Sequence, residues 1–368
     1  MADNIYKSRQ ESFKNYLDKE KVETAIVMSP VNIYFFTGFY SNPHERFFAC
    51  IFDNRKDNVS LFVPALDLSA AEERANVDHI TTVADTDNPY ARLRDVLGTH
   101  VSSFGIEKNM VSVYRYEQIA DHFPQTRFVN IEDLISTKRL KKTDDEIQVV
   151  RKAVEITERV MERGINKVTP GMTELELKAE MQYNMMVLGA DGPAFDTTVL
   201  SGEKTALPHG HAGKRKIREG DFLLIDMGVT VDGYHSDITR TFVVGNASEK
   251  QVSMYETVLE ANKKAIEAAK VGELLKNIDQ AARDYIQARG YGEFFNHRIG
   301  HGLGLEVHEA PSIHSENTSL LETGMLFTIE PGVYIPGFGG VRIEDNVYID
   351  EDGRVEVLTS YPKSLKVI

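Results

Sequence analysis

The chain has 368 residues, which is longer than a single hydrophobic core usually supports. Of these residues, 42% are hydrophobic and 27% charged, which is the balance of an ordinary globular protein. With 56 acidic against 42 basic residues, the formal net charge of -14 disfavours a nucleic-acid partner, because phosphates would be repelled. The polar N-terminus, the lack of a long apolar run and the single Cys50 predict a cytoplasmic protein without signal peptide, membrane span or internal disulfide.

The first third of the chain alternates short apolar runs with amphipathic stretches, which is typical of a small α/β layer domain. We predict strands at 24–28, 33–36, 47–52, 59–63 and 104–107. We predict helices at 66–75, 90–97 and 116–122. A basic stretch without apolar periodicity, 138–142, predicts a boundary between a domain of residues 1–138 and a second domain of residues 139–368.

The second domain shows three helix start signals. Thr143 and Thr173 are each followed three residues later by glutamate, and Ser248 by glutamine, which is the capping-box spacing. The helix after Thr173 should end at Gly189, because glycine suits a left-handed helix end. Strands are predicted at 222–227 and 238–244, followed by helices that end near residues 270 and 290.

This order of elements, two helices followed by a hairpin, occurs twice, the second time roughly one hundred residues after the first. Acidic residues recur at equivalent places: Asp226 and Asp237 in the first hairpin, Glu330 and Glu344 in the second. The pattern predicts two related halves packed about a pseudo-twofold axis.

In the first hairpin, Asp226 ends an apolar strand and a turn centred on Val231 and Asp232 would place Asp237 directly across from it. Their odd spacing predicts that both carboxylates point to one face. Two like charges directly opposed are costly unless a cation lies between them, so the pair favours a metal site over two surface acids.

The second hairpin repeats this logic. Glu330 and Glu344 have an even spacing, which suits a loop with an odd number of residues around 336–338 and again makes two acids face each other. Arg342 stands two residues before Glu344 and therefore on the same face of its strand.

Between the hairpins, His297, His301 and His308 are interleaved with glycines, which permits close backbone packing around a site. Four carboxylates and one imidazole suit hard or borderline divalent ions such as Mn²⁺, Co²⁺ or Fe²⁺, and less obviously a structural Zn²⁺. The set is large enough for two ions about 3.5 to 4 Å apart that share bridging carboxylates.

The motifs around these residues closely resemble those of the pita-bread metallopeptidases. Five residues carry the resemblance, in the contexts Asp-Met-Gly, His-Ser-Asp-Ile-Thr-Arg-Thr, Gly-His-Gly-Leu-Gly, Ile-Glu-Pro-Gly and Arg-Ile-Glu-Asp: Asp226, Asp237, His301, Glu330 and Glu344. It covers residues 140–360, and the N-terminal domain is similar to that of the creatinase, aminopeptidase P and prolidase branch. The stretch 37–47 looks most like that of compact bacterial Xaa-Pro dipeptidases.

The resemblance implies an α/β creatinase-like N-terminal domain, an α+β pita-bread catalytic domain with an internal pseudo-twofold repeat, and a homodimer. It further implies hydrolysis of Xaa-Pro dipeptides by a water or hydroxide between two divalent ions, with Mn²⁺ first and Co²⁺, Fe²⁺ or Zn²⁺ as alternatives. Asp226 would bind one ion, His301 and Glu330 the other, and Asp237 and Glu344 would bridge both.

The same resemblance assigns catalytic roles. Glu330 would take the proton of the nucleophile, while His209 and His308 match histidines that hydrogen-bond the substrate carbonyl and the developing charge. The alternative for both histidines is that each caps a turn.

Four residues are candidates for substrate binding: His297, Arg298, Arg342 and His44. Many prolidases carry an arginine shortly after the His-Glu pair to grip the substrate carboxylate, and Ser312 stands at that place here. Arg298 could replace it, because a guanidinium grips a carboxylate bidentately. A second possibility is that His44, with Arg46, closes over the site of a partner subunit, and the alternative for these two residues is a solvated loop. His297 could instead support a metal ligand, and Arg342 could instead hold an acidic ligand in place.

Three other functions use the same fold. An aminopeptidase P removes one residue from longer Xaa-Pro peptides, a creatinase-type hydrolase works without metal, and non-catalytic members bind peptides. The complete set of five ligands favours an enzyme that uses metal, and the compact N-terminal domain favours a dipeptidase.

Overall fold

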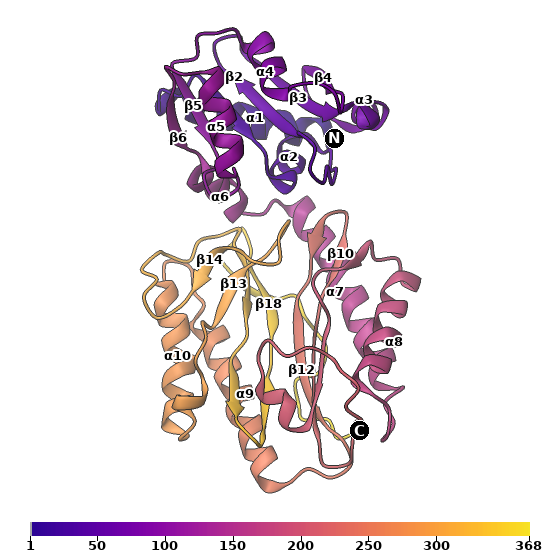
Figure 1. Cartoon of the computed structure of the whole chain (residues 1–368). Coiled ribbons are helices and arrows are strands. Elements are labelled where there is room, and N and C mark those ends of the chain that lie inside the picture. The colour runs from indigo at the N-terminus through magenta and orange to yellow at the C-terminus, as the bar shows by residue number, and fades with distance from the viewer. Residues whose placement is uncertain (1) are drawn as a thin grey trace. The chain divides into compact units, whose positions relative to one another are not determined.

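A computed structural model describes residues 2–368 of the chain and, of their side chains, those from Ile5 onward (Figure 1). The chain divides into two compact units, 1–138 and 139–368. Within residues 2–368, no helix is both long and apolar enough to cross a bilayer.

The N-terminal unit is built on a six-stranded mixed sheet of order β4-β3-β2-β1-β5-β6. Its strands are β1 (Thr24–Val27), β2 (Ala49–Asp53), β3 (Asn58–Pro64), β4 (His79–Val83), β5 (Ser103–Ile106) and β6 (Arg127–Asn130). Its helices are α1 (Ala2–Lys19), α2 (Pro30–Thr37), α3 (Leu68–Arg74), α4 (Pro89–Leu97), α5 (Val113–His122) and α6 (Glu132–Leu140), of which the last crosses the boundary between the units. The predicted α/β domain is therefore present.

One predicted strand of this unit is wrong: residues 33–36 belong to helix α2. Ser29 caps the helix by accepting a hydrogen bond from the backbone N–H of Asn32, and Pro30 stands in its first turn. Gly38 ends it in the left-handed conformation, with φ of 74°. A short, wholly apolar run has no period that separates a buried helix from a strand, and the flanking Ser-Pro and Gly decide for the helix.

The C-terminal unit contains two helix pairs, each of which is followed along the chain by a set of strands. The first pair is α7 (Asp144–Ile165) and α8 (Glu174–Val187), and the second is α9 (Glu249–Ala268) and α10 (Leu275–Ala288). Thr143, Thr173 and Ser248 form capping boxes that begin three of these helices, which confirms all three start signals. Gly189 has φ of 90°, as expected of a left-handed residue beyond the end of α8.

Each helix pair packs on the strands of its own half. The first half has β7 (Gly192–Pro193), β8 (Thr198–Ser201), β9 (Phe222–Met227), β10 (Val229–Val231), β11 (Tyr234–His235) and β12 (Ile238–Val243). The second has β13 (Gly300–Gly302), β14 (Glu309–Ile313), β15 (Leu326–Ile329), β16 (Gly332–Ile335), β17 (Gly339–Arg342), β18 (Asp345–Ile349) and β19 (Val355–Val357). The order of two helices followed by strands thus occurs twice, as predicted (Figure 1). One buried apolar cluster lies in the first half, and the other lies mainly in the second half and also includes Phe222 and Val243 of the first.

A buried ionic brace joins the two halves behind the strands that carry the acidic residues. Arg240 of β12 donates hydrogen bonds to the Asp345 carboxylate at 2.9 Å and to the carbonyl oxygen of Glu344 at 2.6 Å. Lys363 donates to the other Asp345 oxygen at 2.8 Å. Because Arg240 and Asp345 are almost completely buried, each charge depends on the other for compensation, and the brace holds β12 and β18 together.

Candidate metal centre

The first acidic hairpin has a different register from the one predicted. Its turn is Asp232-Gly233, with φ of 47° and 79°, one residue later than expected and typical of a type I′ turn. The pairing therefore shifts by two residues, and Thr239 rather than Asp237 lies opposite Asp226. A shift of two keeps side chains on the same face, so both carboxylates still point to one side, although they are diagonal neighbours and not direct partners.

In the second hairpin the predicted arrangement is confirmed. The strand pairs β15–β18 and β16–β17 share one register, in which Ile329 lies opposite Asp345 and Gly332 opposite Arg342. Glu330 and Glu344 face each other at the break between these two ladders. The loop between Ile335 and Gly339 has three residues, as the even spacing predicted.

His301 is the central residue of β13, which pairs with β15. Its Nδ1–H donates to the carbonyl oxygen of Gly302 at 3.1 Å, which leaves the Nε2 lone pair free to bind a metal. Nε2 lies 3.4 Å from a Glu330 oxygen and 3.7 Å from an Asp237 oxygen. Burial lowers the pKa of His301 to about 3, so the imidazole is neutral and suited to ligation.

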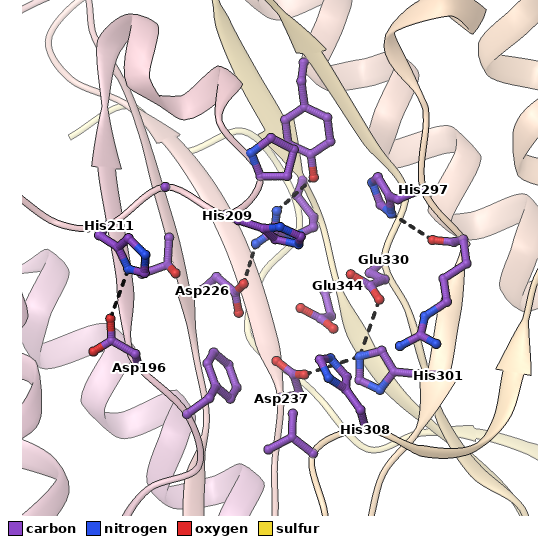
Figure 2. A pocket seen from close by; sticks show the side chains of 18 residues that line it. Asp196, His209, His211, Asp226, Asp237, His297, His301, His308, Glu330 and Glu344 are labelled. Atoms are coloured by element: carbon purple, nitrogen blue, oxygen red, sulfur yellow. Dashed lines mark hydrogen bonds and ion pairs between the residues drawn. The ribbon is translucent and has the colours of Figure 1, made fainter. Parts of the chain in front are cut away.

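The five predicted ligands surround one space (Figure 2). Ligand atoms of Asp237, His301 and Glu344 lie within 4.8 Å of one another, and all three residues are buried. Among residues 2–368, one oxygen of Asp226 and one of Asp237 are buried without a hydrogen-bond partner. Burial, together with the neighbouring carboxylates, raises the pKa of Asp237 and of Glu344 well above ordinary values. This oxygen-rich set, short of positive charge, fits divalent cations.

The raised pKa values predict how metal binding depends on pH. Burial raises the pKa of Glu330 to about 7, so the metal-free protein binds protons that its unfolded chain has lost. The free energy of unfolding of the metal-free protein is therefore undiminished below the ordinary carboxyl pKa. It falls as the pH rises from that value through about 7. Because a divalent ion replaces these protons, the increase in Tm on adding Mn²⁺ should grow from about pH 5 to about pH 8.

Melting curves with EDTA and with Mn²⁺ at several pH values would measure this increase. A gain in Tm that is constant or shrinks with rising pH would contradict the assignment of these carboxylates as ligands.

Arg342 lies beside the acidic set and makes three side-chain contacts. It pairs with the Asp226 carboxylate, donates from Nε to the Thr239 hydroxyl at 3.0 Å and from Nη1 to the Tyr334 hydroxyl at 2.8 Å. These contacts favour the alternative that Arg342 holds an acidic ligand. Tyr334 was not predicted as a site residue, although its even spacing from Glu330 places it on the same strand face.

A cavity of about 480 Å³ opens onto this centre and is formed by residues of the C-terminal unit. His209, His297, Arg298 and His308 all line it. The ring of His308 is nearly perpendicular to that of His301, with centroids 4.2 Å apart. Several further lining residues were not predicted, among them Phe195, Asp196 and Val307. These three stand in loops and irregular segments without a chemical motif, so only their placement in space reveals them.

Two of the predicted substrate residues are joined by a hydrogen bond from the side chain of one to the backbone of the other. The Nδ1–H of His297 donates to the carbonyl oxygen of Arg298 at 2.8 Å. Burial lowers the pKa of His297 to about 4, so this ring is neutral. The Arg298 guanidinium donates to the Ser312 hydroxyl at 3.2 Å, and therefore reaches the position where an arginine was expected from the resemblance.

His44 and Arg46 lie in the N-terminal unit, on the loop between α2 and β2. Arg46 pairs with Asp85 at 2.8 Å, and His44 has a positive φ of 53°. The role of His44 stays a prediction.

The fold of two related halves and the buried cluster of carboxylates and imidazole together fit a metallopeptidase. The model of metallopeptidase family M24 matches residues 148–351, and the model of the creatinase/prolidase N-terminal domain matches residues 9–141. The chain belongs to metallopeptidase family M24. The predicted family and the creatinase-like and pita-bread fold classes are confirmed.

Individual relatives agree with this assignment. The chain is 40% identical to the Xaa-Pro dipeptidase of Pyrococcus furiosus, over 94% of this chain and 96% of the relative. The crystal structure of a prolidase from Thermococcus sibiricus matches with a TM-score of 0.93 and 36% identity, covering 99% of both chains. An X-Pro aminopeptidase from Thermotoga maritima matches with a TM-score of 0.86 and 33% identity, over 95% of this chain and 98% of that one.

Proposed function

We propose that this protein is a metal-dependent dipeptidase that hydrolyses the bond preceding proline. The observation that carries the proposal is the convergence of four carboxylates and one neutral imidazole at the base of a cavity of about 480 Å³. Relatives named Xaa-Pro dipeptidase and prolidase, similar over nearly the whole chain, support the substrate class.

Two divalent ions would be held by five residues that line the cavity: Asp226, Asp237, His301, Glu330 and Glu344. When bound, such ions act as Lewis acids that polarise the scissile carbonyl and lower the pKa of a water molecule. The Arg342 guanidinium would orient Asp226, since it pairs with that carboxylate and is itself held by Thr239 and Tyr334.

Proton transfer would fall to Glu330 and the two substrate histidines. Glu330 carries one carboxylate oxygen 3.4 Å from His301 and lines the cavity, so it can accept a proton from the attacking water. His209 and His308 are exposed in the cavity and can donate hydrogen bonds to the substrate carbonyl and to the charge that develops on it. The proline nitrogen leaves as an amine and must receive a proton, and the proton that Glu330 has taken from the water can supply it.

Arg298 is the proposed anchor of the substrate carboxylate. Its guanidinium lies in the cavity and has, within residues 2–368, a single side-chain partner, the neutral Ser312 hydroxyl, which leaves donors available for a carboxylate. His297 donates to the Arg298 carbonyl oxygen and would keep this residue in place.

The test is an activity screen with Mn²⁺ added. Xaa-Pro dipeptides should be cleaved, and tripeptides with proline second, or dipeptides amidated at the C-terminus, should be cleaved at least about 10-fold more slowly because they lose or displace the carboxylate that Arg298 binds. Faster cleavage of the tripeptides would favour the second candidate, an X-Pro aminopeptidase, which the Thermotoga maritima neighbour supports.

Finer properties also belong to the proposal. Mn²⁺ is the first ion to test, with Co²⁺, Fe²⁺ and Zn²⁺ as alternatives. A homodimer and a cytoplasmic location stay predictions. A non-catalytic peptide-binding protein would show no divalent metal on elemental analysis and no turnover in the same screen.

A further inference from the structure

A buried ionic cluster lies next to the loop that carries His308 and has no place in the proposed chemistry. Lys142 donates to one oxygen of the Glu309 carboxylate at 2.6 Å, and Arg139 pairs with the other oxygen. Arg139 also pairs with Glu306 at 2.7 Å. We call these three ion pairs the linker clasp, because Arg139 and Lys142 are among the first residues after the boundary between the two units.

The inner part of the clasp is shielded from water. The side chains of Lys142, Glu309 and Arg139 are 2%, 7% and 8% exposed. Burial alone would raise the pKa of Glu309, but the two cations outweigh it and lower that pKa, so the carboxylate stays charged. A buried charge without its partner is strongly destabilised, and therefore the three groups must remain together in the folded protein.

The clasp holds a segment that has little regular structure of its own. Residues 303–308 lie between β13 and β14 and contribute to neither strand. Gly304 packs so closely on the clasp that a Cβ atom there would lie 2.9 Å from the Lys142 side chain and 2.7 Å from the Glu309 carboxylate. The backbone N–H of Glu306 also donates to Glu309, at 3.4 Å. The loop is thus attached to the clasp at Glu306 and ends directly at Glu309.

His308 directly precedes Glu309, and within residues 2–368 its ring makes a contact with the His301 ring but no hydrogen bond or ion pair. Its position in the cavity therefore depends on the backbone that carries it. The backbone is held at Glu309 by Lys142 and Arg139, from a segment more than 160 residues earlier in the chain.

We propose that Lys142 and Arg139 are positioning residues that place His308 for its contact with substrate, by holding Glu309 and the 303–308 loop. The inference rests on the proposed function, because it assumes that His308 touches the substrate. A displacement of about 1 Å in a group that contacts the reacting atoms can cost about 100-fold in rate.

The test is a double-mutant cycle with Lys142→Met and His308→Ala, measured on an Xaa-Pro dipeptide with Mn²⁺. Lys142→Met should lower kcat/KM about 10- to 100-fold, mainly through kcat, while bound metal per chain stays as in the wild type. In the His308→Ala background the same substitution should have little further effect, since the side chain that it positions is gone. Lys142→Arg should recover most of the activity.

The matched control is Lys141→Met. Lys141 is the neighbouring lysine and is also ion-paired, to Glu322, but both side chains are about half exposed, so this variant should keep wild-type kcat/KM. If Lys142→Met fails to fold, Glu306→Ala removes only the outer pair of the clasp, at a side chain that is 47% exposed, and should lower kcat/KM by a smaller factor.

Three results would overturn the inference. Full activity of both Lys142→Met and Glu306→Ala would show that the clasp does not position the loop. Equal loss of activity from Lys142→Met with and without His308 would show a general structural effect. Absence of Xaa-Pro hydrolysis by the wild type would refute the proposed function and, with it, the positioning role.

Discussion

Replacing Asp237 by alanine is expected to abolish hydrolysis, with a loss of at least about 10⁴-fold in kcat/KM, because the substitution removes one of the buried carboxylates that would hold the ions. Asp237 is 4% exposed, and one of its oxygens is buried without a partner. Its loss should leave the remaining ligands too few to retain two ions through dialysis. Elemental analysis and a turnover assay on the same sample would measure both effects.

The Asp237→Ala variant should nevertheless fold. The pKa of Asp237 is raised by its burial and by the carboxylates around it, so this charge opposes folding in the metal-free protein and its removal relieves repulsion. Without metal its Tm should equal or exceed that of the wild type, and Mn²⁺ should raise it little. Asp352→Ala, which removes an exposed acid of the same unit, is the control and should behave as the wild type. Unchanged turnover in Asp237→Ala would refute the metal centre.

The second large effect is expected from Glu330→Gln. Glutamine keeps an oxygen that can face an ion but cannot accept a proton as a carboxylate does. We expect kcat to fall about 10²- to 10⁴-fold, with KM nearly unchanged and metal partly retained. Steady-state kinetics together with metal analysis would separate loss of the base from loss of the ions.

Glu316→Gln, at an exposed position of the same unit, controls for the change of charge and should keep wild-type kinetics. Two outcomes would contradict the role of Glu330. Wild-type turnover in Glu330→Gln would exclude it as the base, and complete loss of metal would indicate that it acts only as a ligand.

Much of the local structure could be predicted from the sequence. Thr143, Thr173 and Ser248 begin helices because each capping box is completed within four residues of chain. The three-residue loop before Gly339 was predicted because strand pairing near a tight turn follows from residue counting. The kinds of side chain available for metal could also be predicted, since two acids recur on each of the two repeated hairpins and a histidine lies between the hairpins.

The local sequence does not determine every element or every strand register. The run 33–36 is apolar throughout, so its helix was mistaken for a strand. In the first hairpin, a turn placed one residue early gave the wrong partner for Asp226, because the register follows from which two residues adopt positive φ. Asp237 stayed on the correct face only because the resulting shift was even.

The amino-acid sequence by itself determined the elements, the repeat and the kinds of side chain available for metal, because caps, turns and alternation act over a few residues. Only the tertiary structure decided which groups meet: Arg342 with Asp226, Arg298 with Ser312, and Lys142 with Glu309. Two of these three pairs join residues more than one hundred positions apart, and all three depend on how strands and loops pack. No local spacing encodes such contacts, since they arise when the two halves and the segment after the domain boundary bury their charges together.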